Sequence, residues 1–386
     1  MWSVPFLLTE KDNMQDEEHL DVMQKEQQGE YLVAVDIGTT TIAMQLLNIK
    51  TGELLQTYTC QNPQKKYGAD VLSRIQAAED GVAKAWMKHA VREVLQQGVT
   101  EFQKRLPQKG RITGMAVAAN TTMLHLLMGY DVSKLGHYPF LPQTLESVKT
   151  KIFGIDTVLL PGISAFVGAD IQADIYALSM HQRKEITLLL DLGTNGEMVL
   201  GNRDKLVATA TAAGPAFEGG VNYYGADLMA LTARLLQEGL LDSTGLLDEP
   251  YFEEGIEIGG VHITQQDIRK LQLAKAAIAA GIQILCRKYG LQDFSEIDRV
   301  FLAGGMGYYL DVSAAAAIGL IPMELKDKTK AVGNAALRGA FLYGKEQPAP
   351  CMVTEFNLAE EPEFDKLYVD AMMLTPSSLC PLAHTL

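Results

Sequence analysis

The chain has 386 residues, which predicts about two domains, and its 47% hydrophobic and 21% charged content is that of ordinary globular proteins. A net charge of −14 without a basic stripe excludes nucleic acid as a main partner, and no apolar run approaches the roughly 20 residues of a membrane span. The start of the chain has no basic segment before its short apolar stretch, so it is a poor signal peptide. We therefore expect a cytoplasmic protein with no membrane partner.

The predicted elements repeat one plan after an acidic, flexible or loosely helical tail at 1–30. In the first half, 31–184, we expect strands at 31–35, 42–47, 111–119 and 157–160, and helices at 69–78, 84–106, 123–128 and 169–180. In the second half, 185–345, we expect strands at 186–190, 197–200, 205–210 and 299–302, and helices at 228–238, 265–289, 313–319 and 333–344. This predicts an α/β duplication with a cleft between the halves, and a C-terminal extension, 346–386, packed on the second lobe.

Two short segments are near copies of each other: 36–41 (DIGTTT) and 191–196 (DLGTNG). Each lies between two apolar stretches, so it predicts the tip of a β-hairpin, not the strand-to-helix turn of a dinucleotide fold. A tip of this kind presents backbone N–H groups and hydroxyls to a phosphate chain. One copy alone would more often be ordinary turn chemistry, but two copies favour a phosphate site. The phosphate-binding candidates are Gly38, Thr39, Thr40, Gly193, Thr194 and Asn195.

Two aspartates end the strands before these tips, Asp36 and Asp191, and can hold Mg²⁺ directly or through water. A third glycine-rich turn, 303–307, is either an ordinary loop after a strand or a site where the backbone can approach adenosine closely. The second interpretation makes Gly304, Gly305 and Gly307 adenosine-binding candidates, because glycine has no Cβ atom.

Asp170 stands at the start of a helix of small residues. It is either an N-terminal cap or the carboxylate that orients the attacking water in phosphoryl transfer, and the two roles are compatible. Small residues at 168–170 and 333–336 would let two helices cross closely at a hinge. The further candidates for the cleft are Asn120, Thr121, Gly214, Glu218, Gly333 and Asn334.

The cysteines at 60, 286, 351 and 380 have neither Cys-x-x-Cys spacing nor that of a plant-type iron–sulfur cluster. The seven histidines show no metal-binding spacing either. We therefore expect no iron–sulfur cluster in this chain.

The order of these motifs resembles that of the sugar kinases, actin and heat-shock chaperone ATPases, the ASKHA superfamily. The segments 36–41 and 191–196 look like its two phosphate loops, 303–307 like its adenosine motif, and 168–180 and 333–344 like its connecting helices. The resemblance implies a duplicated, ribonuclease-H-like fold of two α/β lobes with ATP and Mg²⁺ in the cleft, and Asp36, Asp170 and Asp191 as catalytic residues.

Longer strings resemble the ATPase part of the reductive activators of corrinoid proteins. They are NPQ at 62–64, YGADVLSRI at 67–75, NTTM at 120–123, LPGI at 160–163, GPAFEG at 214–219, QLAKAAI at 272–278 and GNAA at 333–336. That family restores an inactive Co(II) corrinoid to Co(I), and its members usually carry an N-terminal 2Fe–2S ferredoxin domain. Here a cysteine-free tail stands in that place, so either a separate donor supplies the electron or only an ATPase remains.

The resemblance implies an ATP-dependent activator of a corrinoid protein with a separate electron donor, and we expect a homodimer. Two other functions fit the same residues. A small-molecule kinase predicts a phosphorylated metabolite, and a nucleotide-dependent interaction module predicts tight ATP binding with negligible hydrolysis. A cluster-bridged activator of the dehydratase type is disfavoured because no two cysteines are suitably placed near the connecting helices.

Overall fold

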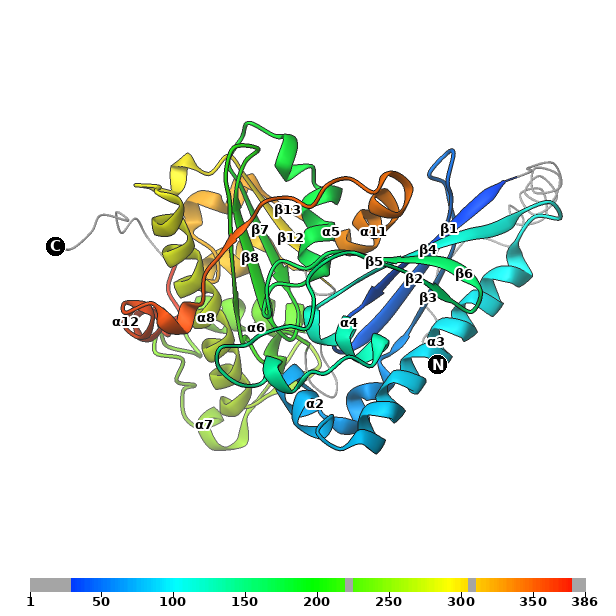
Figure 1. Cartoon of the computed structure of the whole chain (residues 1–386). Helices are drawn as coiled ribbons and strands as arrows, with labels where there is room; N and C mark the ends of the chain where they lie inside the picture. The colour runs from blue at the N-terminus through cyan, green and yellow to red at the C-terminus, as the bar shows by residue number, and fades with distance from the viewer. Residues whose placement is uncertain (1–28, 219–224, 305–309, 377–386) are drawn as a thin grey trace, which may run out of the picture.

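Two lobes, each built on a six-stranded sheet, make up the computed structural model, which describes residues 29–218, 225–304 and 310–376 (Figure 1). The first sheet has the order β3-β2-β1-β4-β6-β5. Its strands are β1 (Glu30–Ile37), β2 (Thr41–Asn48), β3 (Leu54–Gln61), β4 (Arg111–Ala119), β5 (Val148–Ile152) and β6 (Ile155–Leu159). Strand β1 is apolar from Tyr31 to Val35 and buried along that run, because both faces of the sheet are covered.

The second sheet repeats the first. Its order is β13-β12-β7-β8-β9-β14. Its strands are β7 (Thr187–Leu192), β8 (Gly196–Gly201), β9 (Leu206–Thr211), β12 (Arg299–Ala303), β13 (Thr329–Gly333) and β14 (Thr354–Glu355). The antiparallel run β7-β8-β9 matches β1-β2-β3, and the parallel run β7-β12-β13 matches β1-β4-β6. The predicted duplication of a two-lobed α/β fold is confirmed.

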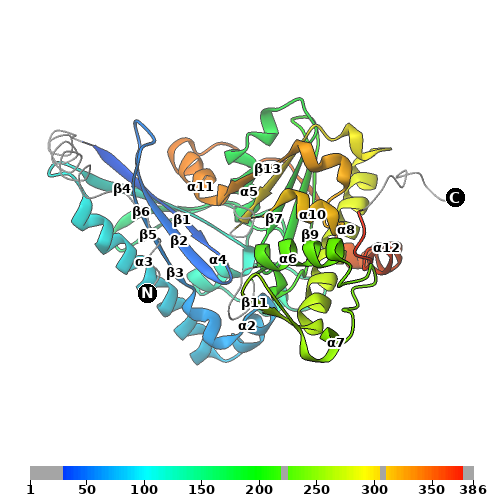
Figure 2. The ribbon, with the colours of Figure 1, turned by 180° about the vertical axis from the view of Figure 1, so that it is seen from behind.

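Helices cover the outer faces of both sheets (Figure 2). The first lobe carries α2 (Val71–Ala77), α3 (Gly81–Arg105) and α4 (Thr121–Met128). The second carries α6 (Gly225–Glu238), α7 (Tyr251–Glu254), α8 (Gln265–Tyr289) and α10 (Val312–Ala317), with the small hairpin β10 (Ile256–Ile258) and β11 (Val261–Ile263). No helix of the described ranges is long and apolar enough to span a bilayer.

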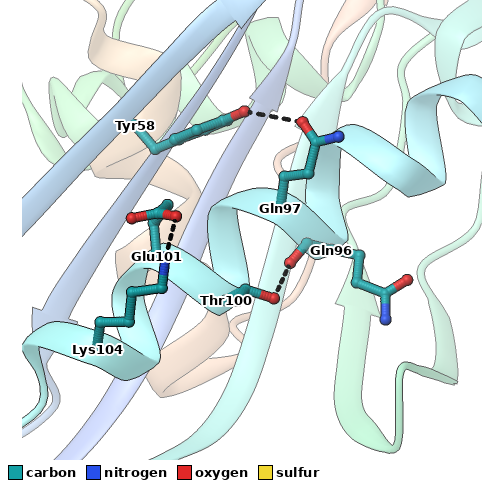
Figure 3. Close-up of polar contacts among 6 residues, drawn as sticks. All are labelled: Tyr58, Gln96, Gln97, Thr100, Glu101 and Lys104. Carbon is teal, nitrogen blue, oxygen red and sulfur yellow. Dashed lines mark hydrogen bonds and ion pairs between the residues drawn. The ribbon is translucent and has the colours of Figure 1, made fainter.

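Helix α3 packs on β2 and β3, with Gly98 at the contact. A Cβ at Gly98 would come within 2.4 Å of the Met44 sulfur, so a larger residue there would displace the Met44 side chain. Beside it, the Tyr58 hydroxyl donates to the Gln97 side chain at 3.4 Å, and the exposed pair Lys104–Glu101 lies one turn further along (Figure 3). These exposed polar contacts add little energy, so the apolar core beneath them holds the helix.

Two helices lie between the sheets, α5 (Ala169–Ala177) and α11 (Ala335–Glu346) (Figure 1). Each follows the equivalent strand of its own half, β6 or β13, and the two pack on each other. A Cβ at Gly339 would lie 1.9 Å from the Ala173 carbonyl oxygen, so the helix backbones touch at this crossing. Helix α5 also packs on the second sheet through Ile171 and Ile175.

The placement of α11 differs from the division of the sequence at residue 184. Although α11 belongs to the second half by sequence, Leu337 and Ala340 pack on β1 and β4 of the first sheet. Gly333, expected to open this helix, instead ends strand β13 with φ +66°. The extension after 346 adds β14 to the edge of the second sheet beside β9 and places α12 (Phe364–Asp370) against α8.

Candidate functional site

A cavity of about 420 Å³ opens where the tips of the β1–β2 and β7–β8 hairpins face each other. The hydroxyls of Thr40 and Thr194, one from each tip, lie 3.3 Å apart. The predicted site residues that line the cavity are Asp36, Gly38, Thr39, Thr40, Asn120, Asp170, Asp191, Gly193, Thr194, Asn195, Gly304 and Asn334. The fold thus brings together twelve residues from segments far apart in the sequence.

The first tip is a tight turn that requires glycine. The Gly38 N–H donates to the Thr41 carbonyl at 2.9 Å, and a Cβ at Gly38 would lie only 2.8 Å from that oxygen. The buried Thr39 hydroxyl accepts from Asn120 Nδ2 at 3.2 Å. Asn120 also caps α4, because its Oδ1 accepts from the Met123 N–H at 2.9 Å.

The second tip is closed in a similar way. The Gly193 N–H donates to the Asn195 carbonyl at 2.9 Å, and the Thr194 carbonyl accepts from the Gly214 N–H at 3.1 Å. A Cβ at Gly196 would lie 2.1 Å from Cδ1 of Ile278 on α8, so a larger residue there would displace that side chain. The second tip thus lies directly against α8.

Four carboxyl groups line the cavity, those of Asp36, Asp170, Asp191 and Glu197, and a fifth, that of Asp174, is buried beside Asp191 outside the lining. Burial, followed by repulsion from neighbouring acids, raises the pKa of Asp170 to about 8. Burial raises the pKa of Asp36 to about 7 and that of Asp191 to about 6, each against a hydrogen bond that lowers it. Among the described residues, no lysine or arginine lines the cavity to offset this charge.

Sequence reasoning missed two of the five acids. Glu197 is the cross-strand partner of Asp191 in the hairpin, and the register of the tip could have revealed it. Asp174 lies one helical turn after Asp170 and is fully buried beside Asp191. Burial and the surrounding acids hold the pKa of both groups well above the ordinary range. Phe217 and Ala226 also line the cavity and were not predicted.

Asp170 does not cap helix α5. The N-cap position is Gly168, and the Asp170 carboxylate accepts from the Ile171 N–H at 2.9 Å inside the first turn. A Cβ at Gly168 would collide with the Asn120 backbone at 2.5 Å, so glycine allows the starts of α4 and α5 to meet at the cavity. The Asp170 carboxyl group lines the cleft, and its role in orienting the attacking water stays a prediction.

Gly304, predicted as an adenosine-binding residue, also packs against Asp191. Its φ is +86°, and a Cβ there would lie 2.4 Å from the Asp191 carboxylate, so glycine lets the end of β12 pack directly on that acid. Gly305, Gly307 and the side chain of Glu218 lie outside the described residues. Three other candidates lie off the cavity lining: Thr121, whose hydroxyl donates to the Ser164 carbonyl, Gly214 and Gly333.

The residues fit a nucleotide with Mg²⁺. Crowded acids with raised pKa values gain from a divalent cation, and small tip residues leave room for phosphates. Although several acids meet at this cavity, among the described residues no three of them are arranged to hold one metal ion by themselves. Asp36 and Asp191 would therefore hold Mg²⁺ together with phosphate oxygens and water, the usual manner for this ion.

The fold and the paired tips define the class of the protein as a two-lobed ASKHA domain. The family model of the RACo middle region matches residues 31–183, and that of the C-terminal ASKHA domain of RACo matches 185–232 and 225–384. The chain belongs to the RACo family, the reductive activators of corrinoid proteins.

Named relatives agree with this family. The chain is 30% identical to corrinoid activation enzyme RamQ of Eubacterium limosum over 88% of its own length and 69% of the relative. It is 23% identical to a [Co(II) methylated amine-specific corrinoid protein] reductase of Methanosarcina barkeri, over 80% of this chain and 68% of the relative. A solved reductive activator for corrinoid, iron–sulfur protein is 29% identical with TM-score 0.78, over 90% of this chain and 66% of that one. The chain thus spans about two thirds of the length of these relatives.

Proposed function

We propose that this protein is a Mg²⁺-dependent ATPase that reductively activates a corrinoid protein. The observation that carries the nucleotide site is the meeting of two glycine–threonine tips over a buried group of acids. The corrinoid protein is proposed as the partner because of the family and its named relatives.

Each residue of the cleft has a role in this proposal. Thr40 and Thr194 would contact phosphate oxygens from opposite lobes, so phosphate binding would bridge the lobes. Asp170 would orient the attacking water. Mg²⁺, held through Asp36 and Asp191, would neutralise charge on the phosphates. Adenosine would lie toward Gly304 and Ala226 on the second lobe.

The electron would come from a separate donor. The support for a separate donor is the sequence, in which the four cysteines lack the spacing of an iron–sulfur cluster. The step adds one electron to Co(II) and gives Co(I). It becomes easier if the activator binds the reduced corrinoid more tightly, since each tenfold preference shifts a one-electron potential by about 59 mV. A 10⁴-fold preference would supply roughly 240 mV, and ATP hydrolysis would then release the partner.

The test is an ATPase assay with and without a Co(II) corrinoid protein, together with spectra recorded in a strong reductant. We expect the corrinoid protein to stimulate hydrolysis and MgATP to increase the Co(I) absorption. Asp36→Asn should abolish both effects, whereas the exposed Asp204→Asn should leave them unchanged. Hydrolysis that responds only to a small metabolite, with that metabolite phosphorylated, would replace the proposal by a kinase.

A further inference from the structure

Asn62 binds the first hairpin tip from behind. It follows β3, is 1% exposed, and its Nδ2 donates to the Gly38 carbonyl at 2.8 Å. Its own N–H donates to the Thr40 carbonyl at 2.7 Å. Its Oδ1 accepts from the Gln64 N–H at 3.0 Å and so caps the short 3₁₀ turn Pro63–Tyr67. Both polar groups of the side chain are therefore used, and two contacts of the residue, one from its side chain and one from its backbone N–H, end on the tip.

The second half has an equivalent but simpler contact. Gly214 lies three residues after the end of β9, whereas Asn62 directly follows β3, and the Gly214 N–H donates to the Thr194 carbonyl at 3.1 Å. In both lobes the chain leaving the third strand thus binds the carbonyl of a threonine in the hairpin tip. Only the first lobe adds a side chain, because glycine at 214 has none to offer.

We infer that Asn62 is a positioning residue that orients the first tip for phosphate. This inference rests on the proposed nucleotide site. A carbonyl oxygen directed at a phosphate repels it, whereas a backbone N–H attracts it. Asn62 lies outside the cavity lining, so the Gly38 and Thr40 carbonyls that it binds point away from the cavity. The tip can then present its hydroxyls and amides to the anion.

A buried cation adds to this arrangement. The Arg74 side chain of α2 is fully buried, and its guanidinium donates to the Gly68 carbonyl at 3.1 Å and contacts the Met123 sulfur at 3.4 Å. The same sulfur lies 3.7 Å from Asn62 Nδ2. Arg74 and Asn62 therefore contact one sulfur atom in the same buried layer, beside the first tip.

The test compares a ligand that reaches the tips with one that does not. Binding of MgAMPPNP and of adenosine is measured by calorimetry on the full chain. Asn62→Ala leaves the Gly38 carbonyl without its side-chain donor and should weaken MgAMPPNP binding about tenfold. Asn62→Asp keeps the oxygen that caps the turn, but its second carboxylate oxygen would face the Gly38 carbonyl and repel it. The loss of MgAMPPNP affinity should therefore be larger than for Asn62→Ala. Adenosine binding should stay within about twofold for both variants.

A matched control is Asn48→Ala. Asn48 is also buried and bonds to the backbone of its own turn, accepting from Lys50 at 2.9 Å and Thr51 at 3.0 Å, but at the far end of β2. Asn48→Ala should leave the affinities for MgAMPPNP and for adenosine unchanged. Equal losses for the two ligands, or no loss in either Asn62 variant, would overturn the positioning role while leaving the nucleotide site in place. Wild-type protein that binds neither ligand would overturn the proposed function and this inference with it.

Discussion

Asn334 Nδ2 donates to the Asp36 carboxylate at 2.6 Å, joining residues that are 298 positions apart. The Oδ1 atom of the same amide accepts from the Leu337 N–H at 2.9 Å and caps α11. One side chain thus ties the first hairpin to the start of a helix from the other half. The contact also lowers the pKa of Asp36 against the larger effect of burial.

This double use makes the two roles of Asn334 separable. Asn334→Asp keeps the capping oxygen but places a further acid against Asp36, so we expect at least tenfold slower ATP hydrolysis with a stability change below about 1 kcal/mol. Steady-state kinetics and urea unfolding measure the two effects. Asn357→Asp, at the exposed cap of another turn, is the control and should change neither. A destabilised variant with normal turnover would contradict the assigned contact.

Removing one acid from the cavity should stabilise the protein while it disables the site. With metal and nucleotide absent, Asp191→Asn should raise the free energy of unfolding by about 1–2 kcal/mol at pH 7. The folded pKa, about 6, lies above the unfolded value, so the carboxylate costs stability above pH 6 and the cost disappears as the pH falls toward 4. The gain should therefore shrink across that range, while turnover falls at least tenfold at neutral pH.

Chemical denaturation at several pH values, beside an ATPase assay, checks this pair of effects. The exposed Asp156→Asn, whose carboxylate pairs with Lys151, provides the control. A variant that loses stability at pH 7 would show that the Asp191 carboxylate is compensated in the folded protein.

The local chemistry of the tips could be predicted from sequence because it repeats. Asp36 and Asp191 each end a buried strand before a glycine–threonine turn, and the structure places both at one cavity. Strand β3 was missed because it is an edge strand with alternating exposure and few apolar residues. Asn62, directly after it, had no visible role until the strand placed it behind the tip.

Long-range placement was harder to predict. Helix α11 packs on the first sheet and on α5, where Gly339 meets Ala173 from the other half of the sequence. Gly304 was predicted from its turn, but its contact with Asp191 depends on the pairing of β12 with β7. Such contacts are set by tertiary packing, which local sequence patterns do not specify.

The crossing of α5 and α11 should not tolerate a methyl group. Gly339→Ala would place its Cβ 1.9 Å from the Ala173 carbonyl, so the helices must separate, at a cost of about 1–3 kcal/mol or more. Gly81→Ala, at the start of α3 with nothing within 4 Å, is the matched control and should be neutral or slightly stabilising. Thermal and urea unfolding distinguish them, and equal stability of the two variants would refute the tight crossing.

Lys275 anchors the end of the described chain to helix α8. The side chain is 2% exposed, and its Nζ donates to the Met373 carbonyl at 2.7 Å. Gln272, one turn earlier, donates to the Met372 carbonyl at 2.9 Å. Burial lowers the pKa of Lys275 to about 8. The ammonium form is therefore disfavoured in the folded state relative to the unfolded chain.

The sign of the resulting pH dependence follows from that pKa. Between about pH 8 and 10.5 the unfolded chain binds more protons, so the contribution of Lys275 to stability rises with pH, by at most roughly 3 kcal/mol. Lys275→Met should flatten this rise in a plot of unfolding free energy against pH. Lys270→Met, exposed on the same helix, should leave the slope of the wild type unchanged. If the plots of unfolding free energy against pH were parallel for wild type and Lys275→Met, the buried amine would have the same pKa in the folded and unfolded states. The contact with Met373 would then not depend on the protonation of Lys275.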